Sequence, residues 1–278
     1  MRRWPMIPFL AAAVMFSTVH CEDVEDSDDP ELDDPDFEED TSRPKLTTEQ
    51  IDKLFALVDA GKKGKVSVKD LMVFSAATRE SLANQSSPQI AEHMDTDKDG
   101  KLSLSEVLKD LNEMPQDENV RKRKDLETAT FREADVNKDG LLDKDEFPAI
   151  FYSDIKQSIL KINTQYIIDD KDANGDGRLT ITEFWKGVEE AEEPPTEIEE
   201  GDFRKVDRDQ DGFVDLAEMM IWESGIVHVE DAMQEIVLAA DTDNDTHVSR
   251  EELSKAHDAV RQTDGFFHFA DWVKHHEL

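Results

Sequence analysis

Short segments of this chain place apolar residues three and four positions apart, next to strongly acidic stretches. That spacing puts the apolar side chains on one face of a helix. The residues expected to face inward are Ile51, Leu54, Phe55 and Val58, then Phe147, Ile150 and Phe151, and finally Leu238. The pattern predicts an all-α chain of amphipathic helices separated by polar loops.

The acidic stretches share a twelve-residue pattern. It has an acid at position 1, an acid or Asn at 3, an acid at 5, Gly at 6, an apolar residue at 8 and Glu at 12. It occurs at Asp95–Glu106, Asp135–Glu146, Asp172–Glu183, Asp207–Glu218 and, with Thr246 at position 6, at Asp241–Glu252. A hard divalent cation takes roughly six to eight oxygen ligands, and this spacing supplies them from one loop. The pattern is that of the EF-hand calcium loop, and its fivefold occurrence argues against ordinary acidic turns.

Positions 1, 3, 5, 9 and 12 of such a loop offer side-chain oxygens, and position 7 offers its backbone carbonyl. The expected ligands are Asp95, Asp97, Asp99, Lys101, Ser103 and Glu106; Asp135, Asn137, Asp139, Leu141, Asp143 and Glu146; Asp172, Asn174, Asp176, Arg178, Thr180 and Glu183; Asp207, Asp209, Asp211, Phe213, Asp215 and Glu218; Asp241, Asp243, Asp245, His247, Ser249 and Glu252. We expect about five Ca²⁺ sites. The last should be weaker, because Thr246 must adopt a backbone conformation that suits Gly.

One further loop, Asp59–Asp70, is the first in the chain and has the same length but a different chemistry. It keeps Gly64 at position 6, yet Gly61 and Lys63 stand where two oxygen ligands belong. The shorter Asp70 replaces the closing Glu. We expect a degenerate hand that binds no calcium and is retained to pair with its neighbour.

The loops recur about every 34 to 40 residues, which is the length of one helix–loop–helix unit and indicates a tandem array. Apolar residues at position 8 suit short two-stranded bridges between paired loops. We expect six EF-hand units in three sequential pairs: residues 46–115, with the degenerate first loop, then 120–193 and 196–262. The proposed boundaries lie near Pro115 and at Pro194-Pro195, where helices would break. The C-terminal segment 263–278 is rich in aromatic residues and either folds onto the last pair or docks a partner.

The two ends of the chain resemble targeting signals. Residues 1–21 combine a basic start with a short apolar run, which is typical of a secretory signal peptide. The chain's one cysteine, Cys21, lies at the expected cleavage site, so metal rather than disulfides would fasten the domains. Residues 22–45 are expected to form an acidic disordered segment. The last residues, His275, His276, Glu277 and Leu278, resemble the HDEL-type retrieval signal of the endoplasmic reticulum.

Two further features bear on the compartment and on partners. Asn84 lies in an acceptor pattern for N-glycosylation within a connector, and Asn244 lies in a second one inside the last calcium loop. We favour Asn84. The net charge of −35 disfavours nucleic acid and anionic lipid as partners. That charge also predicts a looser metal-free state, because bound calcium offsets part of the self-repulsion.

The signal peptide, the acidic segment, six tandem hands and the His-x-Glu-Leu ending together resemble the CREC family, the reticulocalbin, calumenin and Cab45 group. The resemblance covers essentially the whole chain, and the ending favours reticulocalbin. It implies low-affinity calcium binding in the lumen of the endoplasmic reticulum, with possible leakage to the Golgi or secretion. It also implies chaperone-like or regulatory contacts with client or calcium-handling proteins. We expect a monomer, with the retrieval receptor as a partner of the C-terminus and no membrane span after signal removal.

Other functions remain open at this point. A calmodulin-like sensor would open an apolar groove for a target helix, but the nine methionines are scattered along the chain. A secreted extracellular calcium-binding protein is a further alternative. An enzyme is disfavoured, because the eight histidines form no zinc-binding pair and no glycine loop suits a phosphate.

Overall fold

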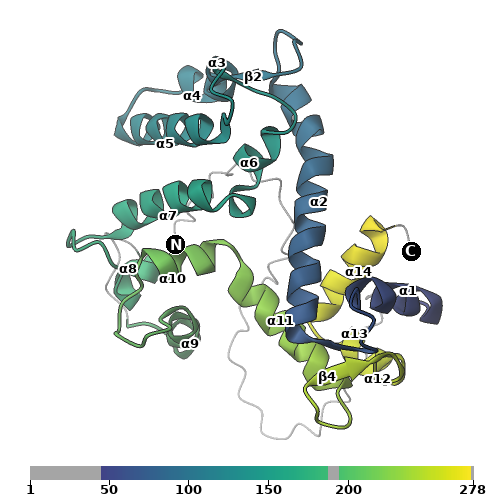
Figure 1. Cartoon of the computed structure of the whole chain (residues 1–278). Coiled ribbons are helices and arrows are strands. Elements are labelled where there is room, and N and C mark those ends of the chain that lie inside the picture. Colours follow the sequence, from purple (N-terminus) through teal and green to yellow (C-terminus); the bar gives the residue numbers. More distant parts are fainter. Residues whose placement is uncertain (1–44, 187–193, 277–278) are drawn as a thin grey trace, which may run out of the picture.

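The computed structural model describes residues 45–186 and 194–276, and these form helices joined by loops and three short pairings between loops. The expected all-α class and the six helix–loop–helix units are confirmed (Figure 1). Among the helices of the described ranges, none is both long and apolar enough to cross a membrane. The expected signal peptide, most of the acidic segment, Glu277 and Leu278 lie outside the described residues.

In the second, fifth and sixth loops, the residues that end the loop also start the helix that leaves it. Ser103 is the N-cap of its exiting helix, and Glu106, three residues on, completes a capping box. Asp215 with Glu218, and Ser249 with Glu252, do the same. Each cap satisfies backbone N–H groups that the first helical turn would leave unpaired. The sequence signal for a closing calcium ligand is therefore also a helix start signal.

The first and sixth hands form one unit. Strand β1 pairs antiparallel with β4, so that Val66 lies opposite Val248. The elements of this unit are α1 (Thr48–Val58), β1 (Lys65–Ser67), the start of α2 (Val68–Met94), α11 (Ile226–Ala240), β4 (His247–Ser249), α12 (Arg250–Lys255), α13 (His257–Arg261) and α14 (Gly265–His275). The expected inward face Ile51–Val58 is buried in its core. Leu238 is 80% exposed, against expectation, because α11 turns Ile236, Val237 and Ala240 inward instead.

The second and third hands form another unit, in which β2 pairs antiparallel with β3. Its elements are the end of α2, β2 (Leu102–Ser103), α3 (Leu104–Val107), α4 (Lys109–Glu113), α5 (Glu118–Ala134), β3 (Leu141–Leu142), α6 (Phe147–Phe151) and η1 (Ser153–Ile155). Phe147 and Phe151 are buried in its core, as expected.

The fourth and fifth hands form the remaining unit, joined by an antiparallel bridge between Leu179 and Val214. Its helices are α7 (Gln157–Lys171), α8 (Ile181–Lys186), α9 (Glu197–Val206) and α10 (Leu216–Glu223). Edge-on contacts between Phe184, Phe203 and Trp222 fill the core of this unit.

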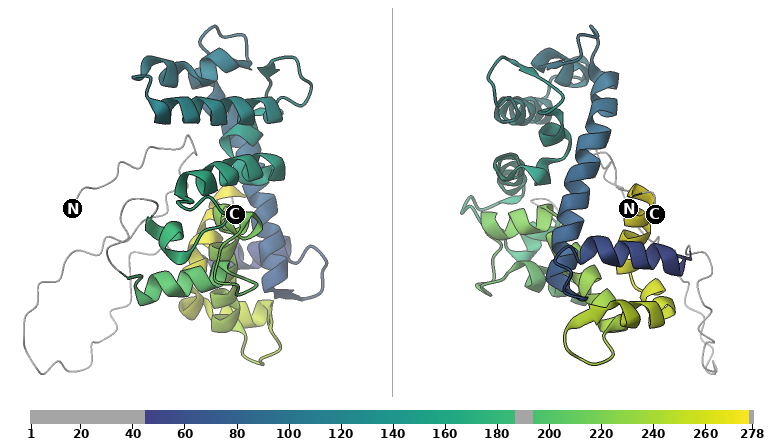
Figure 2. Two further views of the ribbon diagram at one scale, coloured as in Figure 1. Left: turned by 90° about the vertical axis from the view of Figure 1, so that its left-hand side faces the viewer. Right: turned by 45° about the vertical axis from the view of Figure 1, so that its right-hand side comes forward.

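The expected sequential pairing is therefore wrong, and so are the unit boundaries at residues 46–115, 120–193 and 196–262. The loops pair first with sixth, second with third and fourth with fifth. The physical reason is α2, whose 27 residues form one helix that runs through Pro88. Such a helix is about 40 Å long and holds the first and second loops at opposite ends (Figure 2). The helix break near Pro115 exists, but it lies inside the second–third unit.

Two expectations outside the loops also change. Asn84 was expected in a connector, yet it is exposed in the middle of α2. The aromatic C-terminal segment does fold onto the sixth hand, but the unit it joins contains the first hand rather than the fifth. Phe266, Phe269 and Trp272 of α14 are buried there, whereas Phe267 is half exposed.

Candidate metal centres

All six loops share one backbone frame, in which the carboxylate at position 1 accepts the amide of position 6. In the second loop the Gly100 N–H donates to Asp95 Oδ2 at 2.9 Å. The same bond links Gly140 to Asp135, Gly177 to Asp172, Gly212 to Asp207, Thr246 to Asp241 and, in the degenerate loop, Gly64 to Asp59. Each loop is thus folded around the carboxylate at its position 1.

The closing Glu is held from both sides in each of the five complete loops. Glu106 Oε1 accepts the N–H of Thr96 at 2.8 Å, and Oε2 accepts the N–H of Ser103 at 2.9 Å. Glu146, Glu183, Glu218 and Glu252 make the equivalent two contacts. These bonds fix both carboxylate oxygens at the loop, where a bidentate ligand is needed.

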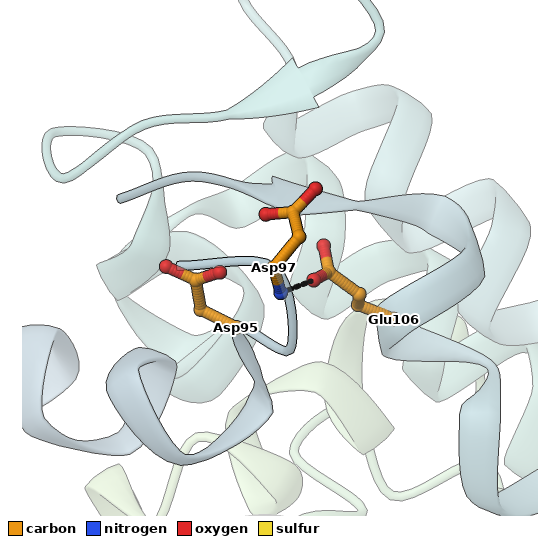
Figure 3. A group of neighbouring side chains, drawn as sticks. All are labelled: Asp95, Asp97 and Glu106. Atoms are coloured by element: carbon orange, nitrogen blue, oxygen red, sulfur yellow. Dashed lines mark hydrogen bonds between the residues drawn. The ribbon is translucent and has the colours of Figure 1, made fainter. Parts of the chain in front are cut away.

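The expected side-chain ligands converge in three loops. Ligand oxygens of Asp95, Asp97 and Glu106 lie within 4.8 Å of one another (Figure 3). The same spacing holds for Asp207, Asp209 and Glu218 and for Asp241, Asp243 and Glu252. In the loops at Asp135 and Asp172, position 3 is Asn137 or Asn174, whose amide oxygen replaces that carboxylate. An all-oxygen donor set of this kind fits a hard cation such as Ca²⁺.

Position 12 is buried or half-buried in each complete site, Asp135 and Asp207 at position 1 are also buried, and positions 3 and 5 form the exposed rim. Glu146, Glu183, Glu218 and Glu252 are buried, and Glu106 is half-buried. Hydrogen bonds from the Ser249 amide and hydroxyl, and from Thr242, lower the pKa of Glu252 to about 2. The closing carboxylate of the last loop therefore stays charged well below neutral pH, as a metal ligand must.

The degenerate loop replaces calcium chemistry with an internal ion pair. The Lys63 ammonium at position 5 lies 2.9 Å from Asp70 Oδ1 at position 12. The Ser67 amide, the Lys63 ammonium and the Ser67 hydroxyl lower the pKa of Asp70 to about 2. A side-chain cation thus lies beside the position-12 carboxylate that a calcium ion would need, which supports the prediction that this loop binds none.

Thr246 adopts the strained backbone that the sequence implied. Its φ of 66° lies in the left-handed region, where the five other loops have Gly at position 6. A non-Gly residue there costs roughly 1–2 kcal/mol. The frame around it is otherwise intact, since its N–H donates to Asp241 at 2.8 Å.

The structure also brings together charges whose role sequence reasoning missed. In each unit, a basic side chain at position 7 of the earlier loop contacts the position-5 carboxylate of the later one. The pairs are Lys65 with Asp245, Lys101 with Asp139 at 3.0 Å, and Arg178 with Asp211 at 3.2 Å. Lys101 and Arg178 were expected to act through their carbonyls alone. The signal was present in the sequence, because position 7 in the later loops is Leu141, Phe213 or His247.

The remaining predicted sites lie away from the loops. Asn84 is exposed, but Ser86 of its acceptor pattern is half-buried, with its hydroxyl bonded to Leu82 O and 2.8 Å from the Tyr152 hydroxyl. His275 and His276, at the end of α14, contact α2: His276 packs 5.5 Å from the Phe74 ring and lies 3.5 Å from the Thr78 hydroxyl.

Comparison with known proteins agrees with the loop geometry. A model of the EF-hand domain pair matches residues 123–189, and a model of the single EF hand matches residues 92–109 and 201–220. The first match spans the third and fourth hands, which are adjacent in sequence but belong to different units here.

Three relatives of this chain are also calcium-binding proteins. The calcium-binding protein LPS1-beta of Lytechinus pictus is 29% identical over 152 residues, 53% of this chain and 58% of its own length. The calcium-binding protein LPS1-alpha of the same organism is 31% identical over 138 residues, 47% of this chain and 38% of its own. The 45 kDa calcium-binding protein of Xenopus tropicalis is 24% identical over 253 residues, 79% of this chain and 70% of its own. With the repeated loop frame and its oxygen donors, these similarities identify the chain as an EF-hand calcium-binding protein.

Proposed function

We propose that the chain is a low-affinity calcium-binding protein of the endoplasmic reticulum and secretory lumen. It buffers calcium there and makes calcium-dependent, chaperone-like or regulatory contacts with client or calcium-handling proteins. The observation that carries the proposal is the fixing of Glu106, Glu146, Glu183, Glu218 and Glu252 in five repeated loops. Luminal calcium is abundant, so sites with dissociation constants of roughly 10⁻⁴–10⁻³ M would respond to its changes.

Two features of the loops support a weak rather than a tight class of site. Position 5 is paired with a cation in three loops, and Thr246 strains one of these. The rim ligands are solvent-exposed. The net charge of −35 acts in the opposite direction on the affinity, because it attracts calcium; binding then offsets self-repulsion and is coupled to compaction.

The proposed location in the secretory lumen is based on the two ends of the chain. The signal-like residues 1–21 and the ending His275–Leu278 support entry into the lumen and retrieval, and so does the resemblance to the CREC group. The alignment with the 45 kDa calcium-binding protein extends over most of this chain, which agrees with that resemblance. Because His276 packs on Phe74, receptor capture would require the end of α14 to leave α2.

A calmodulin-like sensor is less well supported by the packing. Such a sensor offers an apolar groove to a target helix. In the first–sixth unit, α14 buries Phe266, Phe269 and Trp272 against the core of the paired hands. The chain thus supplies its own helix to that surface, and target binding there would first have to displace it.

A calcium titration of the purified protein, expressed from the full chain, tests the proposed low-affinity calcium binding. We expect five sites in the submillimolar to millimolar range by calorimetry, together with a gain of helical signal by circular dichroism. Micromolar or tighter binding in every loop would contradict a luminal buffer. The absence of any binding would overturn the function itself.

Retention of the protein inside cells tests the proposed location in the endoplasmic reticulum. In cells expressing the full chain, the secreted fraction is compared with that of a variant carrying two extra glycines after Leu278. The extension blocks the terminal carboxylate and leaves the contacts of His275 and His276 with α2 unchanged. Retention of the first protein and secretion of the second supports retrieval. Equal secretion of both would contradict it.

A further inference from the structure

We propose that Lys65 is a tethered competitor of calcium, whose ammonium lowers the calcium affinity of the sixth loop from outside that loop. Lys101 and Arg178 act in the same way on the third and fifth loops. This inference rests on the proposed weak calcium binding and supplies a cause for it. It assigns a role to three side chains that the ligand pattern treats as irrelevant.

The contacts of Lys65 carry the argument. Its ammonium lies 3.1 Å from Asp243 Oδ2 and also pairs with Asp245 Oδ2. These are the carboxylates at positions 3 and 5 of the sixth loop, so one ammonium engages two expected calcium ligands. Lys65 itself belongs to the degenerate loop and is an expected ligand of no site.

The pairing of β1 with β4 places the Lys65 ammonium within contact distance of Asp243 and Asp245. Lys65 lies opposite Ser249 in the register, so its side chain extends along the surface of the neighbouring loop. The Asp245 carboxylate is then engaged on both oxygens: Oδ1 accepts the His247 N–H at 3.0 Å, and Oδ2 accepts the Lys65 ammonium.

The same arrangement recurs in the other two units. Asp139 Oδ1 accepts the Leu141 N–H at 2.9 Å, while Oδ2 accepts the Lys101 ammonium at 3.0 Å. Asp211 Oδ1 accepts the Phe213 N–H, and Oδ2 accepts the Arg178 guanidinium, which also stacks 4.1 Å over the Phe213 ring. Three independent repetitions of one geometry argue against a chance surface ion pair.

The contact has opposite effects on the two states of the loop. Without calcium, the ammonium offsets repulsion between Asp243 and Asp245 and stabilises the loop. With calcium, a positive charge remains near a divalent cation and shares its ligands. Removing the ammonium should therefore strengthen calcium binding and, at the same time, destabilise the metal-free protein.

The decisive experiment compares Lys65→Met with a matched variant, Lys62→Met. Both remove one positive charge from the same loop, and Lys62 is exposed and has no ion pair among the described residues. The proteins are expressed from the full chain with ¹⁵N-threonine and ¹⁵N-glycine. The amides of Thr246, Gly100, Gly140, Gly177 and Gly212 then report each complete loop in a calcium titration, with the Thr246 signal assigned through a Thr246→Ser variant.

We expect Lys65→Met to raise the affinity reported by Thr246 about two- to fivefold, with the four glycine signals unchanged. Lys62→Met should change the Thr246 affinity less. In thermal unfolding, Lys65→Met should lower the midpoint in chelator and raise it in saturating calcium. A purely structural contact would lower it under both conditions.

Three outcomes would overturn the inference. They are an unchanged or weaker affinity at Thr246, equal shifts from the two lysine variants, and a lowered unfolding midpoint in both chelator and calcium. Failure of the Thr246 amide to respond to calcium while the glycine signals do would also overturn it. If none of the five amides responds, the calcium-binding function itself fails, which is a different result.

Discussion

Val66 of the first loop lies directly opposite Val248 of the sixth, so the two ends of the repeat array form one unit. The contact is buried, with both side chains in the core that α14 completes. Lys65, next to Val66, consequently lies beside the calcium ligands of the sixth loop. The degenerate first hand is thus a structural and electrostatic partner of a binding hand.

The entry of α14 into that core depends on one glycine. A Cβ on Gly265 would lie 2.3 Å from the Ala232 carbonyl oxygen and 2.5 Å from the Ile236 side chain. Because both neighbours belong to α11, the helices would have to separate. We expect Gly265→Ala to destabilise the protein by about 2 kcal/mol or more in thermal or chemical unfolding.

The matched control is Gly201→Ala in α9, where an added Cβ meets no atom within 4 Å. We expect this change to be neutral or to stabilise by up to about 1 kcal/mol, because Ala favours the helix. A Gly265→Ala protein as stable as the original would show that α14 does not pack on α11 as described.

Each closing Glu should account for one calcium ion. Changing Glu183 to Gln removes the charge of the bidentate ligand and keeps the shape of the side chain. We expect the calorimetric stoichiometry to fall by one, since the loop loses its position-12 charge. Glu118→Gln, at the exposed start of α5, is the control and should leave the stoichiometry unchanged. An unchanged stoichiometry for Glu183→Gln would mean that the fourth loop binds no calcium.

The degenerate loop should gain a site when its ligands are restored. The combined changes Gly61→Asp, Lys63→Asp and Asp70→Glu supply oxygens at positions 3, 5 and 12 and remove the Lys63–Asp70 ion pair. We expect one additional calcium ion by calorimetry. Gly61→Asp alone is the control, because Lys63 still neutralises the loop. A gain of a site in the control would show that Lys63 does not exclude calcium.

Acidification should weaken the attachment of α14. Burial lowers the pKa of His268, although Asp271 opposes this, and burial and the charge of His275 lower the pKa of His276, from an ordinary value of 6.5. The folded protein therefore binds these protons less readily than the unfolded chain. The stability that the neutral rings contribute is complete above about pH 6.5 and is lost as the pH falls through their folded pKa values.

The measurement is thermal unfolding at pH 7 and pH 5.5 in saturating calcium. We expect the midpoint of the original protein to fall between these pH values by about 2–4 °C more than that of a His268→Gln, His276→Gln double variant. His93→Gln, at an exposed position on α2, serves as the control. Equal pH sensitivity of the original protein and the double variant would exclude these two rings as the cause.

The loops could be predicted because their chemistry is local. Ligand spacing, helix caps and the left-handed position 6 all lie within twelve residues, and the frame around Asp95 and Glu106 agrees with them. The pairing of the hands could not be read in this way, because it depends on how far a helix continues. Pro88 would usually mark a break, yet α2 passes through it.

The error at Leu238 has a related cause. An apolar residue near the end of a helix can lie on either side of the apolar stripe, and the helix that packs against it determines which side is buried. In α11 that neighbour is α14, which selects Ile236 and Val237. The basic residues at position 7 argued only against the sequential pairing, since Lys65 and Lys101 place a cation in both of the first two loops.

The joining of the first hand to the last also sets an order of assembly during synthesis. The second–third and fourth–fifth units can each close once their own neighbouring segments have left the ribosome. The first hand must wait for α11, β4 and α14 before Ile51, Leu54 and Val66 can be covered. Until then its apolar face is exposed in a partly synthesised chain, and because a long loop must close last, we expect this to be the slow step of folding.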